Sequence, residues 1–236
     1  MHAGGFAVRH LYLAFLFAFV IMAFGFWPSL YSGAAGPIDP LRAIHGALAA
    51  TWMALLVLQS WLIGHRYWKQ HRFFGRASRY VTVLLVASSF LVVRDMLGPQ
   101  SHFGHDLRLT LAWLDLWSLV LFSGLYIAAI AYRRTLSLHA RFMASTVFVV
   151  LPPALGRIYG MNIAALGGLK GALPPTYMTV EICLAALIVW DAMNRRFLAP
   201  FPITFGALGA MALTMLAAPH WPIYVAFAQL LGLPPA

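Results

Sequence analysis

The chain has 236 residues, of which 62% are hydrophobic and only 9% are charged, and its mean hydropathy is +0.80. This composition excludes an ordinary soluble domain, which needs far more charge to cover its surface. The net charge of +10 does not indicate a nucleic-acid partner, because the basic residues lie at the ends of apolar stretches. The single cysteine, Cys183, excludes an intramolecular disulfide and a cysteine-based metal cluster.

Apolar stretches long enough to cross a bilayer recur along the chain. About 20 helical residues, rising 1.5 Å each, span a hydrocarbon core roughly 30 Å thick. The sequence predicts an all-α integral membrane protein, a bundle of about seven transmembrane helices forming one domain, 1–236. The expected spans are 11–31, 44–64, 80–97, 109–132, 141–165, 177–193 and 203–217. We expect the shorter segment 223–233 to lie in the membrane interface or to extend the seventh span past a kink.

The first span has a second interpretation. An apolar stretch near the amino terminus that is followed by small residues, here at 32–36, is also typical of a secretory signal. Its length and the Trp27-Pro28 interruption favour a retained helix.

The basic residues predict the orientation of these spans. A cluster without any acidic residue follows the second span, and such clusters normally stay in the cytoplasm. The cluster consists of Arg66, Lys69, Arg72, Arg76 and Arg79. Alternating spans add Arg9, Arg133, Arg134, Arg141, Arg195 and Arg196 to the same side, which then holds eleven of the 16 basic residues. We expect an inside amino terminus and an outside carboxyl terminus, in the cytoplasmic (inner) membrane if the host is bacterial.

Five ionisable residues from four spans fall in one layer of the outer half of the membrane. Counted from the cytoplasmic anchors at 1.5 Å per residue, they lie about 21–27 Å along their helices. They are Arg94, Asp95, Asp115, Arg157 and Glu181. Because a charge facing lipid costs at least a few kcal/mol, we expect the five side chains to point inward and meet. His45, Tyr159, Asn162 and Tyr177 lie nearby, and we predict that all nine residues line a ligand-binding cavity that opens outward.

Two prolines interrupt the fifth span beneath this layer. Pro152 and Pro153 remove helical hydrogen bonds and predict a kink, and broken helices at membrane depth commonly line a cavity. A plainer interpretation stays open, in which Arg94 and Arg157 extend to the lipid headgroups and Asp95 pairs locally with Arg94.

Histidines allow two further interpretations that involve a cofactor. Imidazole ligands suit zinc or copper, and the expected outer side holds a candidate set, namely His45, His102, His105, Asp106 and His220. A helical bundle can also hold b-type haem between histidines on two helices, and His65 and His139 lie at similar inner depth. All these histidines lie at or beyond the predicted helix ends, where solvated loops and caps are common.

Several short motifs resemble a family of bacterial multi-pass membrane proteins known only as a domain of unknown function. The residues concerned are His45, Gln59, the loop motif His71-Arg72-x-x-Gly75-Arg76, the segment His139-Ala140-Arg141-Phe142-Met143, and Arg157. They cover the second to the fifth span. The resemblance implies a membrane fold and a cytoplasmic His-Arg loop, but it implies no activity.

We therefore expect a membrane protein that handles a small polar or ionic ligand as a sensor, carrier or accessory subunit. The alternative is a membrane oxidoreductase or electron carrier that uses b-type haem or a histidine-bound metal. The lipid bilayer is the expected partner, and a second membrane protein or a second copy of the chain remains open.

Overall fold

The computed structural model describes the backbone of residues 5–31 and 39–234 and the side chains of 10–28 and 39–234. Helices make up all the regular secondary structure of this part of the chain. They are α1 (Gly5–Tyr31), α2 (Pro40–Gly64), α3 (Trp68–Leu97), α4 (His105–Ala131), α5 (Leu136–Val150), α6 (Pro152–Asn162), α7 (Leu169–Met193), α8 (Pro200–Thr214) and α9 (Pro222–Leu231), with short 3-10 turns at Ala164–Leu166 and Ala218–His220. The side chain of Arg9 and residues 32–36 lie outside the described part.

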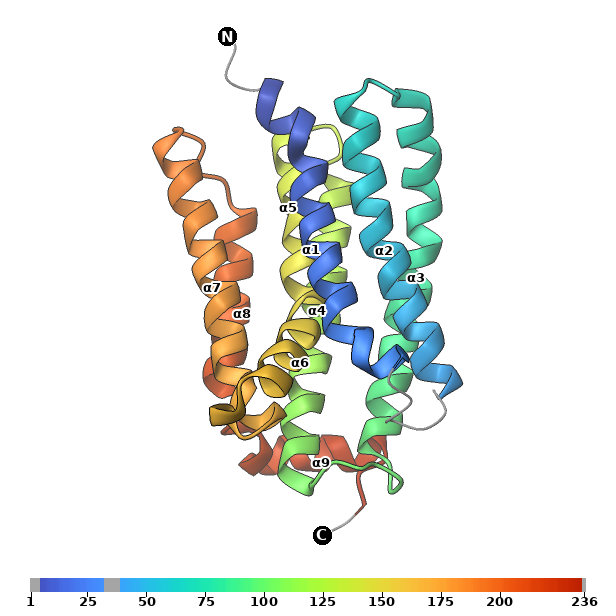
Figure 1. Ribbon diagram of the computed structural model, residues 1–236, viewed down its shortest axis with the longest axis vertical. Helices are drawn as coiled ribbons and strands as arrows, with labels where there is room; N and C mark the ends of the chain where they lie inside the picture. The colour runs from blue at the N-terminus through green and yellow to red at the C-terminus, as the bar shows by residue number, and fades with distance from the viewer. Residues whose placement is uncertain (1–4, 32–38, 235–236) are drawn as a thin grey trace.

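The long helices run up and down beside one another as a bundle (Figure 1). Consecutive helices pack side by side, as α1 does on α2 and α2 on α3, and α1 also packs on α6. One end carries the α2–α3, α4–α5 and α7–α8 turns, in which Arg66, Arg133 and Arg195 lie. We call it the basic end, and we call the opposite end, where α9 lies, the α9 end.

Six helical segments of the described residues are long and apolar enough to cross a membrane. They are His10–Pro28, Pro40–Gly64, Trp68–Leu97, His105–Ala131, Leu136–Asn162 and Leu169–Met193. The seventh expected span corresponds to α8, whose 15 residues cover only about 22 Å. The expectation of about seven spans therefore stays a prediction, whereas the all-α membrane bundle is confirmed.

The predicted kink in the fifth span is confirmed. Helix α5 ends at Val150 and α6 begins at Pro152, because a proline ring cannot donate the next helical hydrogen bond. From this point α6 leans away from the axis of α5 (Figure 1).

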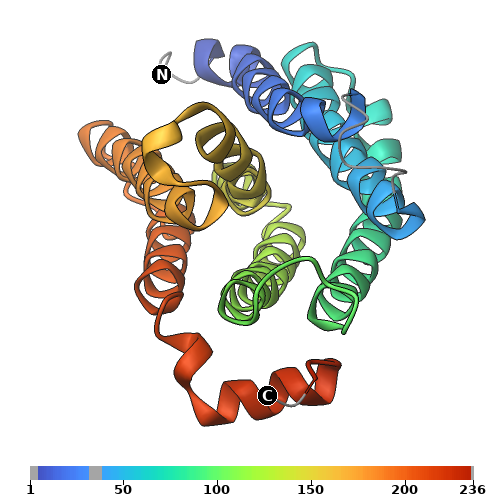
Figure 2. The same ribbon diagram turned by 60° about the horizontal axis from the view of Figure 1, so that its bottom comes forward.

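Helix α9 crosses the end of the bundle instead of spanning it, as the view onto that end shows (Figure 2). Its Tyr224 is buried, and the hydroxyl donates a 2.7 Å hydrogen bond to the carbonyl oxygen of Leu109 in α4. Of the two expectations for segment 223–233, the transverse placement describes the structure, and a kinked extension of α8 is wrong.

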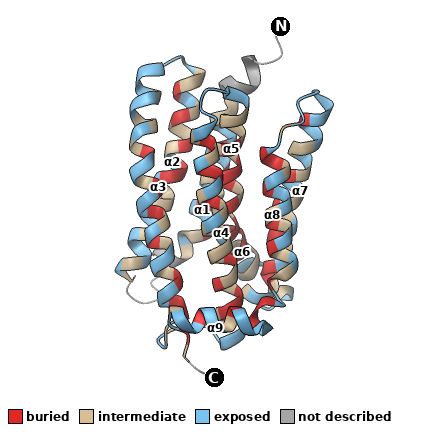
Figure 3. Ribbon diagram, turned by 180° about the vertical axis from the view of Figure 1, so that it is seen from behind, coloured by how far each residue is buried: buried red, intermediate tan, exposed pale blue. Residues whose placement is uncertain are grey.

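Buried residues lie mainly on the sides of the helices that face other helices (Figure 3). Many of the exposed residues are nevertheless large and apolar. Trp52, Met53 and Leu208 are almost completely buried. By contrast, Phe17 is 68% exposed and Leu213 is 86% exposed. Exposing so many large apolar side chains to water is energetically unfavourable, whereas the hydrocarbon chains of lipids solvate them.

Candidate functional site

Three of the nine predicted site residues are close enough to interact electrostatically. Asp115 of α4 interacts electrostatically with Arg157 of α6 and with the buried hydroxyl of Tyr177 in α7. The same carboxylate influences Tyr224 of α9, where burial is the main cause that raises the pKa of the hydroxyl. Polar groups of three helices, α6, α7 and α9, thus lie within electrostatic range of one carboxylate on α4.

The carboxylate and the guanidinium at this site are not paired with each other. No nitrogen–oxygen contact within 4.0 Å joins Asp115 to Arg157, and Asp115 forms no side-chain hydrogen bond among the residues the structure describes. Asp115 is also only half-buried. A partly accessible charge without a hydrogen-bonding partner can accept hydrogen bonds from a molecule that enters the site.

Local structure fixes the position of Arg157. Its Nη1 donates a 2.9 Å hydrogen bond to the carbonyl oxygen of Pro153, one turn back along α6. Its guanidinium carbon lies 4.3 Å from the centre of the Phe26 ring of α1, within range of a cation–π interaction. The missing side chain of Gly25 lets α1 pack closely against α6, because a Cβ at this position would lie 2.5 Å from the backbone oxygen of Ala154.

Glu181 lies one turn from Tyr177 on α7 and faces α8. A Cβ on Gly209 would lie 3.7 Å from its Oε1, so the missing side chain of the glycine leaves room for the carboxylate. Both carboxylate oxygens are buried, and neither has a hydrogen-bonding partner among the described residues. An orphaned buried polar group costs about 1–3 kcal/mol, so stability alone does not explain this residue.

The other predicted polar residues have local partners. The Tyr159 hydroxyl lies 2.9 Å from Thr179 Oγ1, which joins α6 to α7. Asn162 donates to the Ile158 carbonyl at the exposed end of α6. His45 Nδ1 lies 3.2 Å from Ser88 Oγ, between α2 and α3.

Arg94 and Asp95 do not join the group, and the expectation that all five ionisable residues meet is wrong. Val93, Met96 and Leu97 occupy the buried face of this turn of α3, which leaves Arg94 and Asp95 on the exposed faces. Residue counting along a helix does not give the direction in which a side chain points.

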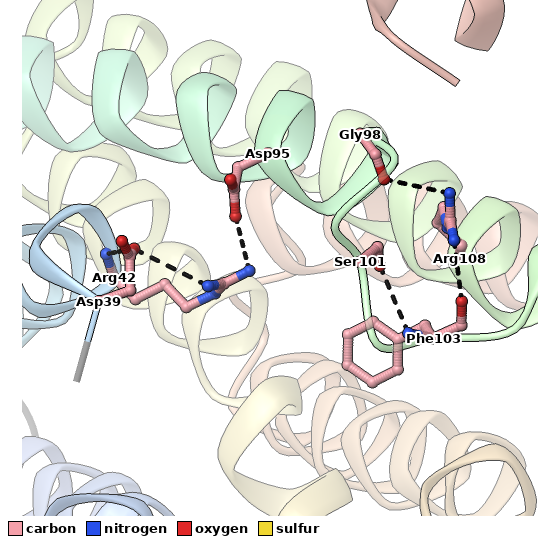
Figure 4. A network of polar contacts seen from close by, with 7 residues as sticks. All are labelled: Asp39, Arg42, Asp95, Gly98, Ser101, Phe103 and Arg108. Atoms are coloured by element: carbon pink, nitrogen blue, oxygen red, sulfur yellow. Dashed lines mark hydrogen bonds and ion pairs between the residues drawn. The ribbon is translucent and has the colours of Figure 1, made fainter. Parts of the chain in front are cut away.

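Both residues form contacts at the α9 end instead. Asp95 accepts a 2.6 Å ion-pair hydrogen bond from Arg42 of α2, whose backbone N–H is capped by Asp39 (Figure 4). Arg94 Nε lies 3.4 Å from the Leu231 carbonyl oxygen of α9. The expected local pairing of Asp95 with Arg94 is therefore wrong.

The predicted metal ligands are not assembled. Throughout the described residues, no three or more His, Cys, Asp or Glu side chains gather where they could hold a metal ion. His102, His105, Asp106 and His220 are all exposed, and the nearest contact among them is 3.5 Å, between the neighbours His105 and Asp106.

The two histidines proposed for haem each have a separate local partner. The ring of His65 stacks on Trp61 at a centroid distance of 4.5 Å, in the exposed α2–α3 turn. His139 Nδ1 lies 2.7 Å from the Ala129 carbonyl oxygen, and the ring interacts electrostatically with His71 of α3. His71 was not among the predicted site residues.

Near the basic end the structure contains an ion pair that sequence reasoning missed. Arg141 of α5 holds Asp191 of α7 with two hydrogen bonds of 2.6 Å, from Nε and from Nη2. The side chains are only 17% and 7% exposed. Asp191 was detectable as an acidic residue within an apolar stretch, but its closeness to Arg195 and Arg196 made it look like part of a solvated turn.

A second missed group lies between α2, α3 and α4 at the same end. Ser78 Oγ lies 3.0 Å from the Tyr126 hydroxyl, and Gln59 Nε2 donates to the His71 carbonyl over 3.1 Å. Three buried atoms here have no hydrogen-bonding partner within residues 10–28 and 39–234, namely Gln59 Oε1, His71 Nδ1 and Thr82 Oγ1. Ordered water would satisfy such atoms without any functional role.

The fold defines a multi-pass, all-α integral membrane protein. In comparisons with known proteins, no family model, no curated protein and no solved structure matches the chain.

Proposed function

We propose that the protein binds a small polar or ionic ligand in the half of the membrane nearer its α9 end, as a carrier, sensor or accessory subunit. The observation that supports this proposal is the unpaired state of Asp115 and Arg157, which interact electrostatically but form no direct salt bridge. A buried polar site is expected to satisfy its own groups unless another molecule completes it.

The charges of this region favour a cationic or zwitterionic ligand. Arg157 contributes one positive charge, whereas Asp115 and Glu181 contribute two negative charges when both are ionised. A ligand with an ammonium or quaternary ammonium group would supply the missing positive charge, and Arg157 would hold a carboxylate group of the same ligand.

We also propose that the basic end faces the cytoplasm, so that the ligand enters from the opposite side. The basic turns, which include Arg66, Arg133 and Arg195, support this orientation. In a bacterial host the membrane is then the inner membrane and the ligand comes from the periplasm. The loop motif His71-Arg72-x-x-Gly75-Arg76 supports the proposed kinship with the family of unknown function.

Thermal unfolding of the purified protein with three probes tests the ligand proposal. Choline supplies a cation, glycine betaine a zwitterion and inorganic phosphate an anion. We expect choline or betaine to raise the melting temperature and phosphate to have no effect. Asp115→Asn and Arg157→Met should abolish the response, whereas Arg133→Met, in an exposed turn, should retain it. A response to phosphate alone, or equal responses in all variants, would contradict the proposal.

The redox alternative keeps one supporting observation, the electrostatic interaction of His71 in α3 with His139 in α5. An absorption spectrum of the purified protein distinguishes the two functions. An intense Soret band that His139→Ala removes would replace ligand binding with haem chemistry.

A further inference from the structure

An apolar groove of about 390 Å³ runs between α1 and α2 on the outside of the bundle. Its walls include Tyr12, Leu16 and Phe19 of α1 and Ala54, Leu58 and Trp61 of α2. It is separate from the Asp115–Arg157 site, because none of its lining residues belongs to α4, α6 or α7. Its length along two adjacent helices and its apolar walls suit a single hydrocarbon chain.

The groove ends at the basic end of the bundle, beneath a stack of aromatic rings. Trp61, which lines the groove, lies 4.5 Å from the ring of His65 and 5.6 Å from the ring of Tyr67, measured between centroids. Trp and Tyr rings of this kind collect at the level of lipid headgroups, where one side of the ring is apolar and the other is wet. The stack therefore places the end of the groove at the membrane surface.

Arg66 lies in the turn that holds this stack. It adopts a left-handed backbone conformation, with φ of 64°, which residues other than glycine rarely adopt. The turn is closed by hydrogen bonds from Arg66 N to Ile63 O, at 3.1 Å, and from Tyr67 N to Leu62 O, at 2.8 Å. An arginine kept in a strained turn, where a glycine would fit better, points to a role for its side chain.

The charge around the mouth of the groove has one sign. Arg66 and Lys69 are exposed in and just after the turn, and Arg72, Arg76 and Arg79 follow along α3. The sequence contains no acidic residue between Asp39 and Asp95. A second copy of the chain packed here in the same orientation would bring basic turn against basic turn, whereas an anionic headgroup would neutralise the cluster.

We propose that the α1–α2 groove and the adjoining basic turn bind one anionic phospholipid, with an acyl chain between Tyr12, Phe19 and Trp61 and the headgroup phosphate at Arg66 and Lys69. The chain supplies affinity through burial of methylene groups, and the cations supply preference for an anionic headgroup.

Native mass spectrometry of the delipidated full-length protein tests this proposal. The probes are phosphatidylglycerol and phosphatidylcholine with identical acyl chains. We expect phosphatidylglycerol to bind about tenfold more tightly, because each nearby cation adds to the attraction. The double variant Arg66→Gln, Lys69→Gln should lose this preference and retain weak binding of both lipids. Its matched control, Arg133→Gln, Arg134→Gln, removes two exposed charges from the α4–α5 turn and should keep the preference.

A second variant tests the groove itself. Ala54 is exposed in α2, so Ala54→Trp fills the groove without disturbing the buried core. We expect it to reduce binding of both lipids about tenfold or more while the melting temperature of the lipid-free protein stays within a few degrees. Equal binding of the two lipids by the unmodified protein, unchanged binding by Ala54→Trp, or a lipid-free dimer that Ala54→Trp dissociates would overturn the proposal.

Discussion

Charged side chains inside the bundle are paired near one of its ends and are not paired near the other. Near the basic end, Arg141 and Asp191 form two short hydrogen bonds and join α5 to α7. Nearer the α9 end, Asp115 and Arg157 interact without a direct salt bridge, and the Glu181 carboxylate has no hydrogen-bonding partner in the described part of the chain. The first pair has the geometry of a structural connection. In the second group the two carboxylates are left without hydrogen bonds from the described residues, which is the basis of the proposed binding site.

The Arg141–Asp191 pair joins α5 to α7 by two hydrogen bonds near the basic end of the bundle. Near the α9 end, α6 leans away after the break at Pro152. Arg157 there contacts the Pro153 carbonyl oxygen and the Phe26 ring but forms no salt bridge with Asp115. Substitutions at the two regions should therefore differ in sign as well as in size.

The largest effect is expected for Asp191→Ala. It leaves the Arg141 guanidinium buried without its partner, and breaking a buried pair from one side costs about 3–5 kcal/mol. Thermal unfolding in detergent should show a melting temperature lower by roughly 10 °C. The double variant Arg141→Met, Asp191→Leu should recover most of this loss, because it removes both charges. A double variant as unstable as Asp191→Ala would mean that the ion pair itself is indispensable.

Gly25→Ala should destabilise the protein by about 1–3 kcal/mol, since the added methyl group would collide with the backbone of Ala154. It should also weaken the response to choline or betaine, because α1 must move and take Phe26 away from Arg157. The control is Gly124→Ala in α4, where a Cβ meets no atom within 4 Å and should stabilise the helix slightly. Equal melting temperatures for the two variants would rule out a tight α1–α6 contact.

Glu181→Leu should have the opposite sign and raise the stability by about 1–3 kcal/mol, because it removes an orphaned buried carboxylate. The same variant should lose part of its response to a cationic or zwitterionic ligand. A higher melting temperature together with a weaker ligand response would show that Glu181 serves binding at the expense of stability, whereas Asp191 stabilises the fold. A fall in melting temperature would show that Glu181 contributes to the packing of α7 on α8.

The smallest effect is expected for Arg42→Gln. Its ion pair with Asp95 is short, but both side chains are 46% exposed, and exposed pairs contribute about 0–1 kcal/mol. The melting temperature should fall by no more than a few degrees. Because salt screens an exposed ion pair, adding salt should reduce even this small difference between the variant and the unmodified protein. A loss as large as that of Asp191→Ala would show that the α9 end is held as firmly as the basic end.

Most of the fold was predictable from the sequence because apolar length and helix-breaking residues act locally. Long apolar stretches determined five uninterrupted helical spans, and Pro152 with Pro153 determined the break between α5 and α6. The sequence also showed that basic residues such as Arg66 cluster in the turns between apolar stretches.

Which charges meet was decided only by the tertiary structure. Residue counting gave a common depth for Asp95, Asp115 and Arg157, but the direction of a side chain depends on how each helix rotates to bury its apolar face. That rotation turned Asp95 out to Arg42, left Asp115 near Arg157, and brought Asp191 to Arg141 across 50 residues of sequence. Such pairings follow from the packing of several helices at once, and no single segment contains them.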